Sequence, residues 1–213
     1  MTARTQPAGL AAMDLTCERG GRRLFEGLSF DVAPGGALLL AGPNGTGKTS
    51  LLRLLAGLLP PSAGRVLWQG RDTAEEPGPW RRALGWLGHD NAVKPQMTVA
   101  GNLAFWAAMA GRGDITGALA ATGLERLAGL PAAMLSAGQR RRLALARLAL
   151  AEGGCWLMDE PSVTLDAASL DRLAAMTARH RAAGGIAVVA SHDTLDLPGA
   201  RRLDLGPTAM GRR

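Results

Sequence analysis

The chain has 213 residues, with 24 lysines and arginines against 18 aspartates and glutamates, so its formal net charge is +6. This length allows one large domain with a sizeable core, and it is too short for two full domains plus a membrane region. No run of about 18 apolar residues occurs, and the N-terminus lacks a basic flank followed by an apolar run. We therefore expect a cytoplasmic protein with neither a membrane span nor a secretory signal.

The sequence pI of about 10.8 favours an anionic partner, such as a nucleic acid or a membrane surface. The arginines are scattered, however, and no zinc-finger, helix-turn-helix or stacking-aromatic pattern accompanies them. Small groups of arginines are typical of solvated faces, so we expect no specific nucleic-acid partner, while attraction to an anionic membrane face stays open. The groups are Arg22-Arg23, Arg81-Arg82, Arg140-Arg141-Arg142 and Arg201-Arg202.

The first part of the chain predicts β-structure. From about Leu10 to Val32, short apolar runs are broken by glycines, which is typical of an antiparallel sheet beside a core. Arg65 to Gln69 predicts another such strand. The two cysteines, Cys17 and Cys155, are unrelated in spacing, and we expect buried thiols rather than a disulfide or a metal pair.

A phosphate-loop pattern, G-x-x-x-x-G-K-[ST], follows an apolar strand predicted over Gly36–Ala41. In this pattern backbone N–H groups surround phosphate oxygens and the lysine ammonium reaches the terminal phosphates. A helix predicted from Thr49 to Leu59 would direct its positive N-terminus at the same anion. The alternative is a glycine-rich turn with an ordinary surface lysine. The candidate residues are Gly42, Pro43, Asn44, Gly45, Thr46, Gly47, Lys48, Thr49 and Ser50.

From Ala92 to about Ala151 the sequence is rich in alanine and leucine at helical spacing, which predicts a helical subdomain. Within it, Ser136 precedes a helix predicted over Gln139–Leu150. The Ser136 hydroxyl and the following N–H groups would stand at a positive helix terminus suited to a phosphate. A capped helix without a ligand is the alternative.

The last part of the chain alternates apolar strands with a helix, as parallel sheets do. Cys155–Met158 and Gly185–Ala190 predict buried strands, and a helix is predicted between them from about Ala167 to Ala183. The first strand ends in Asp159-Glu160, where one carboxylate can hold Mg²⁺ and the next can orient an attacking water. His192 follows the second strand, at the sheet edge where ligands collect, although a core histidine is an equal alternative.

In this order the segments resemble an ATP-binding cassette (ABC) ATPase over nearly the whole chain. The resemblance rests on the phosphate loop, Leu135–Gln139, Asp159-Glu160, Pro161–Asp166 and Ser191-His192. It implies an α/β P-loop NTPase fold with a RecA-like parallel core, an antiparallel β subdomain and an inserted helical subdomain. The implied single domain covers 1–213, with the core and β subdomain at about 10–91 and 152–213 and the helical subdomain at about 92–151.

The resemblance also implies roles and partners. Lys48 and the loop would hold the phosphates of ATP, Thr49 and Asp159 would hold Mg²⁺, Glu160 would act as general base and His192 would contact the γ-phosphate. Two copies would stack head to tail, so that one copy completes the ATP site of the other. Ser136 and Gly138 would act across that dimer, Gln139 is a further implied nucleotide-binding residue, and Asp166 belongs to the turn that links the two sites.

Three positions depart from the family pattern. Arg19 stands where an aromatic residue normally stacks on adenine, and a guanidinium can also stack on a base. His89 replaces the glutamine that usually senses Mg²⁺ and touches the membrane partner, while Gln96 lies too far along the chain to substitute. Ala137 stands where glycine is usual in the family's signature segment, here Leu135–Gln139, a small change because the backbone N–H groups and the Ser136 hydroxyl would bind the phosphate.

Within the family, the chain is most similar to the ATP-binding subunit of the cytochrome c maturation system, a haem exporter. This implies a pair of subunits at the cytoplasmic face of the bacterial inner membrane, beneath an integral membrane subunit and further maturation proteins. ATP turnover would then drive haem delivery or release of a haem-loaded chaperone. The segments that carry the similarity are Cys17–Arg19, Leu24–Phe30, Leu67–Gly70, Leu87–His89 and Leu135–Gln139.

Three alternatives stay open. A transporter ATPase for another cargo would share every ATP motif. A soluble cassette ATPase that acts on DNA or ribosomes would usually carry two cassettes or an insertion that is not visible here. A non-enzymatic haem-binding protein is disfavoured because His89, His180 and His192 show no paired or cysteine-linked arrangement.

Overall fold

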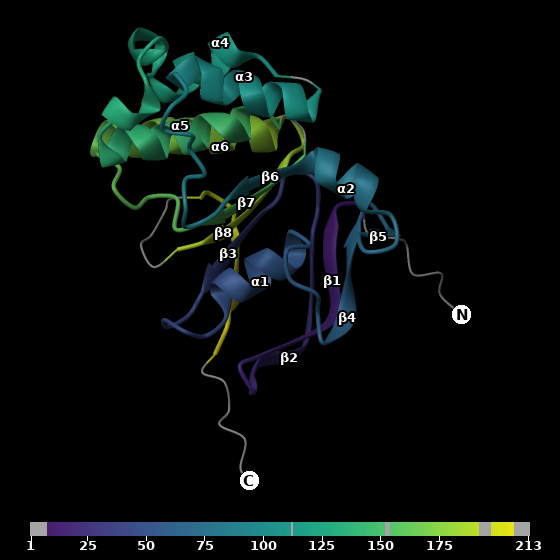
Figure 1. The fold of residues 1–213 in the computed structure, drawn as a ribbon. Helices are drawn as coiled ribbons and strands as arrows, with labels where there is room; N and C mark the ends of the chain where they lie inside the picture. Colours follow the sequence, from purple (N-terminus) through teal and green to yellow (C-terminus); the bar gives the residue numbers. More distant parts are fainter. Residues whose placement is uncertain (1–7, 112, 152–153, 192–196, 207–213) are drawn as a thin grey trace.

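The computed structural model describes residues 8–111, 113–151, 154–191 and 197–206. It contains two β-sheets, with one helix between them and further helices over the outer face of the larger sheet (Figure 1). The antiparallel sheet has the order β2-β1-β4-β5, with β1 Leu10–Arg19, β2 Arg22–Val32, β4 Ala63–Trp68 and β5 Arg71–Asp72. The parallel sheet has the order β6-β7-β8-β3-β9, with β6 Leu84–Leu87, β7 Cys155–Asp159, β8 Ile186–Ala190, β3 Ala37–Ala41 and β9 Arg201–Asp204.

Helix α1 (Lys48–Leu55) lies between the two sheets and shares one apolar core with both. Its leucines 51, 52, 54 and 55 are all buried, because the helix has sheet on opposite sides. The helix was predicted to reach Leu59, but it ends four residues earlier. Gly57 adopts a left-handed φ of 70° just beyond the end, and Trp80 donates a hydrogen bond to the Leu55 carbonyl oxygen at 3.0 Å.

The opposite face of the parallel sheet is covered by α5 (Ala137–Ala149) and α6 (Ala167–Ala182) (Figure 1). Strand β7 shows why its sequence is continuously apolar. Cys155 and Leu157 pack in the core around α1, whereas Trp156 and Met158 pack in the core beneath α5 and α6. Both faces of the strand are therefore buried.

A third apolar core joins α5 to α3 (Val99–Ala110), α4 (Ile115–Thr122) and two short 3₁₀ helices, η1 (Glu125–Leu127) and η2 (Ala132–Met134). Helical structure was expected from Ala92, but α3 begins only at Val99. The buried Asn102 side chain accepts a hydrogen bond from the Lys94 N–H and donates to the carbonyl oxygens of Lys94 and Thr98. These bonds hold the preceding segment in an irregular turn, and the Thr98 side chain caps the helix.

Four elements were not anticipated: the short helix α2 (Pro77–Ala83) and the edge strands β5, β6 and β9. Strand β9 begins with Arg201 and Arg202, which are both exposed at the rim of the sheet. Across from it, Gly42 approaches the Leu205 carbonyl oxygen so closely that a Cβ atom could not fit. The end of this strand, continued by Leu205, therefore packs closely against the start of the phosphate loop.

Both cysteines are buried and free, as expected, and burial raises the pKa of each thiol. In the described ranges, no helix combines the length and the apolar character needed to cross a bilayer.

Candidate functional site

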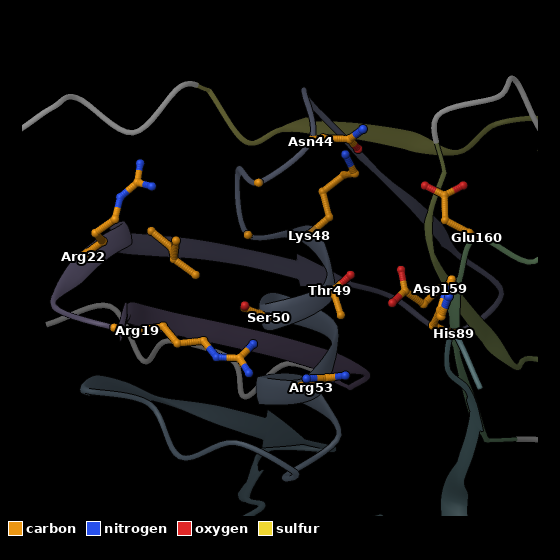
Figure 2. Close-up of a pocket in the computed structure, with 14 residues that line it drawn as sticks. Arg19, Arg22, Asn44, Lys48, Thr49, Ser50, Arg53, His89, Asp159 and Glu160 are labelled. Carbon is orange, nitrogen blue, oxygen red and sulfur yellow. The ribbon is translucent and has the colours of Figure 1, made fainter. Parts of the chain in front are cut away.

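A cavity of about 620 Å³ opens between the antiparallel sheet and the carboxyl ends of the parallel strands. Figure 2 shows three groups of side chains around it. Arg19 and Arg22 project from the β1–β2 hairpin on one side, and His89, Asp159 and Glu160 lie on the other. The phosphate loop and the start of α1, which carry Asn44, Lys48, Thr49 and Ser50, lie between these two groups.

The loop that precedes α1 has the backbone required to bind an anion. Gly45 and Gly47 adopt left-handed φ values of 81° and 104°, which side-chain-bearing residues rarely adopt. Gly47 is the N-cap of α1, and a glycine has no side chain that could accept hydrogen bonds from the N–H groups of the first turn. These N–H groups and the helix dipole favour a phosphate at this position.

Lys48 is buried, and carbonyl oxygens of the loop hold its ammonium group. The Nζ atom donates to the Gly42 oxygen at 2.6 Å and to the Pro43 oxygen at 3.1 Å. Since an ammonium has three N–H donors, these two bonds orient the group and leave a third donor for a ligand. Thr46 also donates to the Pro43 oxygen, at 3.0 Å, which fixes the curve of the loop.

Two adjacent carboxylates end strand β7 on the opposite side of the cavity. Asp159 is buried, and its carboxylate faces Thr49 in Figure 2. Glu160 has a left-handed φ of 47°, and its N–H donates to the Ala190 oxygen at 2.8 Å. The chain therefore turns sharply here, which directs the two carboxylates differently (Figure 2).

The Thr49 hydroxyl and the Asp159 carboxylate are oxygen donors of the kind that Mg²⁺ prefers. Among the described residues, no group of three or more His, Cys, Asp or Glu side chains could hold a metal ion. Because Mg²⁺ commonly takes only one or two protein ligands together with substrate phosphates, this sparse donor set fits that ion.

The basic side of the cavity is formed by arginines. Arg19 and Arg22 are exposed, and Arg53, on the cavity-facing side of α1, is half-buried. His89 also lines the cavity and is exposed, beside Asp159 in Figure 2. The structure thus brings Arg19 and His89 to the same cavity as the phosphate loop, from opposite sides.

The signature residues are organised around a helix N-terminus. The Ser136 Oγ accepts from the Gln139 N–H at 3.2 Å, and the Gln139 Oε1 accepts from the Ser136 N–H at 2.8 Å, a reciprocal cap of α5. Asp166 caps α6 with its own carboxylate, which accepts from the Ser169 N–H at 2.9 Å. These hydrogen bonds with Ser169 hold the pKa of Asp166 below its ordinary value.

Ser136, Gly138, Gln139 and Asp166 are absent from the described residues that line the cavity of their own chain. Gly138 and the Asp166 turn are neighbours, since a Cβ on Gly138 would lie 3.0 Å from the Thr164 oxygen. The four residues therefore form a second group, separate from the phosphate loop. His192 lies outside the described residues, and its role stays a prediction.

Arg141 supports the site from behind the two carboxylates, and the prediction that its group of arginines occupies a solvated face is wrong for this residue. Its side chain is only 4 % exposed, and it donates to backbone oxygens of Asp159 and Glu160. Helical spacing gave a usable signal, because Ala144 and Leu145 lie three and four positions further on and are buried.

Residues 25–163 match the protein family described as ABC transporter. The chain belongs to the ABC transporter family. Among curated ABC relatives, the cytochrome c biogenesis ATP-binding export protein CcmA of Rhodospirillum rubrum is 52% identical over 93% of this chain and 86% of its own length. The protein of the same description from Paramagnetospirillum magneticum is 49% identical over 94% of this chain and 95% of its own.

Solved structures of ABC proteins share the fold. The ATP-binding subunit of an ABC transporter matches with a TM-score of 0.78 at 24% identity, over 86% of this chain and 79% of that one. A dimeric ATP-binding cassette in a post-hydrolysis state, bound to ADP and Pi, matches with a TM-score of 0.76 at 23% identity, over 86% of this chain and 88% of that one. The predicted fold class, an α/β P-loop domain of ABC type, is confirmed.

Proposed function

We propose that this chain is the ATP-hydrolysing subunit of an ABC exporter that serves cytochrome c biogenesis. One observation carries the ATPase part: the Asp159-Glu160 turn lies across the cavity from the phosphate loop and Lys48. The names and high identities of the two bacterial relatives support the cytochrome c part. Haem is the cargo that we propose, carried directly or released with a chaperone.

In the proposed reaction, the loop N–H groups and Lys48 hold the β- and γ-phosphates of ATP. Mg²⁺, held by Thr49 and Asp159, would neutralise charge on the phosphates. Glu160 orients a water in line with the γ-phosphate and accepts its proton. Phosphoryl transfer needs mainly positioning and charge neutralisation, so this small set of groups suffices. His192 is the proposed γ-phosphate contact at the neighbouring strand end.

The base of ATP would lie on the arginine side of the cavity. Arg19 is proposed to stack on adenine in place of an aromatic ring, because a planar guanidinium can pack against a purine face. His89, on the opposite side, is proposed to occupy the position that senses the bound nucleotide and Mg²⁺.

We propose that two copies assemble head to tail. The group formed by Ser136, Gly138, Gln139 and Asp166 lies away from the phosphate loop of its own chain, so it is available to a second copy. The start of α5 would then contribute hydroxyl, backbone N–H groups and helix dipole to the partner's γ-phosphate. The dimer would sit beneath an integral membrane subunit at the cytoplasmic face of the inner membrane, with further cytochrome c maturation proteins.

A genetic complementation tests this proposal. In the bacterium that encodes the chain, its gene is deleted and replaced by the wild-type gene, by Glu160→Gln or by Glu125→Gln. Glu125 is a matched control because it is exposed on η1 and does not line the cavity. We expect haem-stained c-type cytochromes with the wild type and the control, and none with Glu160→Gln, because loss of a general base slows a reaction by about 10²–10⁴-fold.

The same three proteins are purified and assayed for ATP binding and hydrolysis. Glu160→Gln should bind ATP with wild-type affinity and lose hydrolysis. Normal c-type cytochromes in the deletion strain would refute the pathway and leave the ATPase intact. Wild-type turnover by Glu160→Gln would instead refute the role of Glu160.

A further inference from the structure

The guanidinium of Arg141 joins three segments that are far apart in the sequence. From α5, its Nη1 donates to the Gly88 oxygen and to the Asn91 Oδ1, both at 3.0 Å. Its Nη2 donates to the Asp159 oxygen at 2.9 Å and to the Glu160 oxygen at 2.6 Å. The Arg141 side chain therefore links α5, which we call the signature helix because Ser136 caps it, to the end of β7 and to the segment after β6.

The two hydrogen bonds from Nη2 act at a strained point of the backbone, the turn at Asp159 and Glu160. Glu160 adopts a left-handed φ of 47°, a conformation that costs a side-chain-bearing residue free energy and persists only where its surroundings impose it. Arg141 fixes the carbonyl groups of Asp159 and Glu160, and β8 fixes the Glu160 N–H through Ala190. The direction of the Glu160 carboxylate therefore depends on a side chain of another element.

The placement of Arg141 is costly. Burial lowers the pKa of its guanidinium, and the charges of Asp159 and Glu160 only partly oppose that effect. Its Nε has no hydrogen-bond partner among the described residues. A buried cation paired with carbonyl dipoles stabilises a fold less readily than well-packed apolar side chains would.

We propose that Arg141 is a positioning residue for ATP hydrolysis: it sets the Asp159-Glu160 turn according to the position of the signature helix. This inference rests on the proposed function. Arg141 lies about one turn after Ser136, so a shift of the α5 N-terminus on meeting a partner's nucleotide moves the guanidinium with it. The γ-phosphate of one site thereby controls the base of the other. The Gly88 and Asn91 bonds carry the same shift to the segment that holds His89.

The test compares Arg141→Met with Arg142→Met in the full-length chain. Arg142 is a matched control because it is the next residue on α5, and its Nη1 donates to the oxygens of Thr122 and Gly123, both at 3.1 Å. These acceptors stand at the C-terminal end of α4, so the printed Arg142 bonds hold α4 and not the Asp159-Glu160 turn. Both substitutions remove an arginine and its hydrogen bonds to carbonyl oxygens, but only Arg141→Met removes bonds to the Asp159-Glu160 turn.

For Arg141→Met, we expect kcat for ATP hydrolysis to fall at least about tenfold while the ATP dissociation constant changes less than about threefold. Arg142→Met should keep kcat within about twofold of the wild type even if its midpoint of thermal unfolding falls. Arg141→Lys, which keeps the charge and some of the donors, should recover part of kcat. It also serves as the second variant if Arg141→Met does not fold.

Hydrogen–deuterium exchange provides a readout that does not depend on activity. Arg141→Met should speed exchange of the amides at 155–165, and Arg142→Met should do so only near 119–124. Equal kcat in the two methionine variants, or equal exchange at 155–165, would overturn the inference. If the wild-type chain does not hydrolyse ATP, both the proposed function and the inference are refuted. If Arg141→Met hydrolyses ATP normally while Glu160→Gln is inactive, only the inference is refuted.

Discussion

Lys48 and Arg141 are the buried lysine and arginine of the described residues, and backbone carbonyl oxygens hold both. A carbonyl group orients a cation but carries no net charge, whereas a carboxylate would neutralise the cation. Lys48 therefore keeps its positive charge for an anion in the cavity. Arg141 uses its charge to fix a turn, because its four hydrogen bonds occupy both Nη atoms.

Also at the residue scale, Arg19→Ala should weaken binding of both ATP and GTP by about twofold to thirtyfold, because cation–π stacking contributes about 0.5–2 kcal/mol and accepts either purine. Titration with fluorescent nucleotide analogues measures this change. Arg65→Ala is the control, since Arg65 is exposed on β4 and does not line the cavity. Unchanged affinity for both nucleotides would remove Arg19 from the base site.

At the scale of elements, the order of buried strands and the phosphate loop could be predicted from the sequence, because each is a continuous local pattern. The boundaries of α1 and α3 could not, since Trp80 and Asn102 set them through contacts with other segments. Strands β6 and β9 have four residues each, and β9 is mostly charged, so neither carries a periodic signal.

The same distinction applies to the site. Lys48, Asp159 and Glu160 were found because they end or follow recognisable strands, and the structure brings them to one cavity. Arg141 was missed because the importance of a buried arginine depends on its distant acceptors. The structure gives the positions of these residues, while the roles assigned to every predicted site residue, Lys48, Asp159 and Glu160 included, and the boundaries of the subdomains stay predictions.

The cap of α6 leads to a prediction about pH. Because the pKa of Asp166 is lowered in the folded chain, its contribution to stability is full above the ordinary aspartate pKa of about 3.9 and is lost as pH falls through the folded value. Asp166→Ala should thus lower the midpoint of thermal unfolding by a few degrees at pH 7, with a smaller difference below about pH 4.

Calorimetry at both pH values checks this expectation. Asp171→Ala is the control, because Asp171 is exposed on the body of the same helix rather than at its N-cap. A deficit for Asp166→Ala that stays constant from pH 7 to pH 3 would show that the ionised cap is not its cause.

At the scale of the whole molecule, a head-to-tail dimer predicts complementation between two inactive variants. Lys48→Ala and Ser136→Arg should each lack ATPase activity, because every site contains one of the two changes. When equal amounts are mixed and exchanged, half of the dimers should carry one site with both wild-type parts. Phosphate release should therefore rise above that of either variant alone and stay below about a quarter of the wild-type rate, because the impaired site does not set the base of the intact one. No recovery on mixing, measured by phosphate release, would favour sites formed within one chain.

The close approach of Gly42 to Leu205 also bears on how this protein is made. Strand β3 lies between β8 and β9 in the sheet. The phosphate loop that follows β3 therefore cannot pack against these two strands until residues 186–204 have been translated. Pairing between segments so far apart is slow to form. We therefore expect the phosphate loop to be synthesised well before it can fold. Nucleotide binding would then stabilise the fold only when the chain is nearly complete.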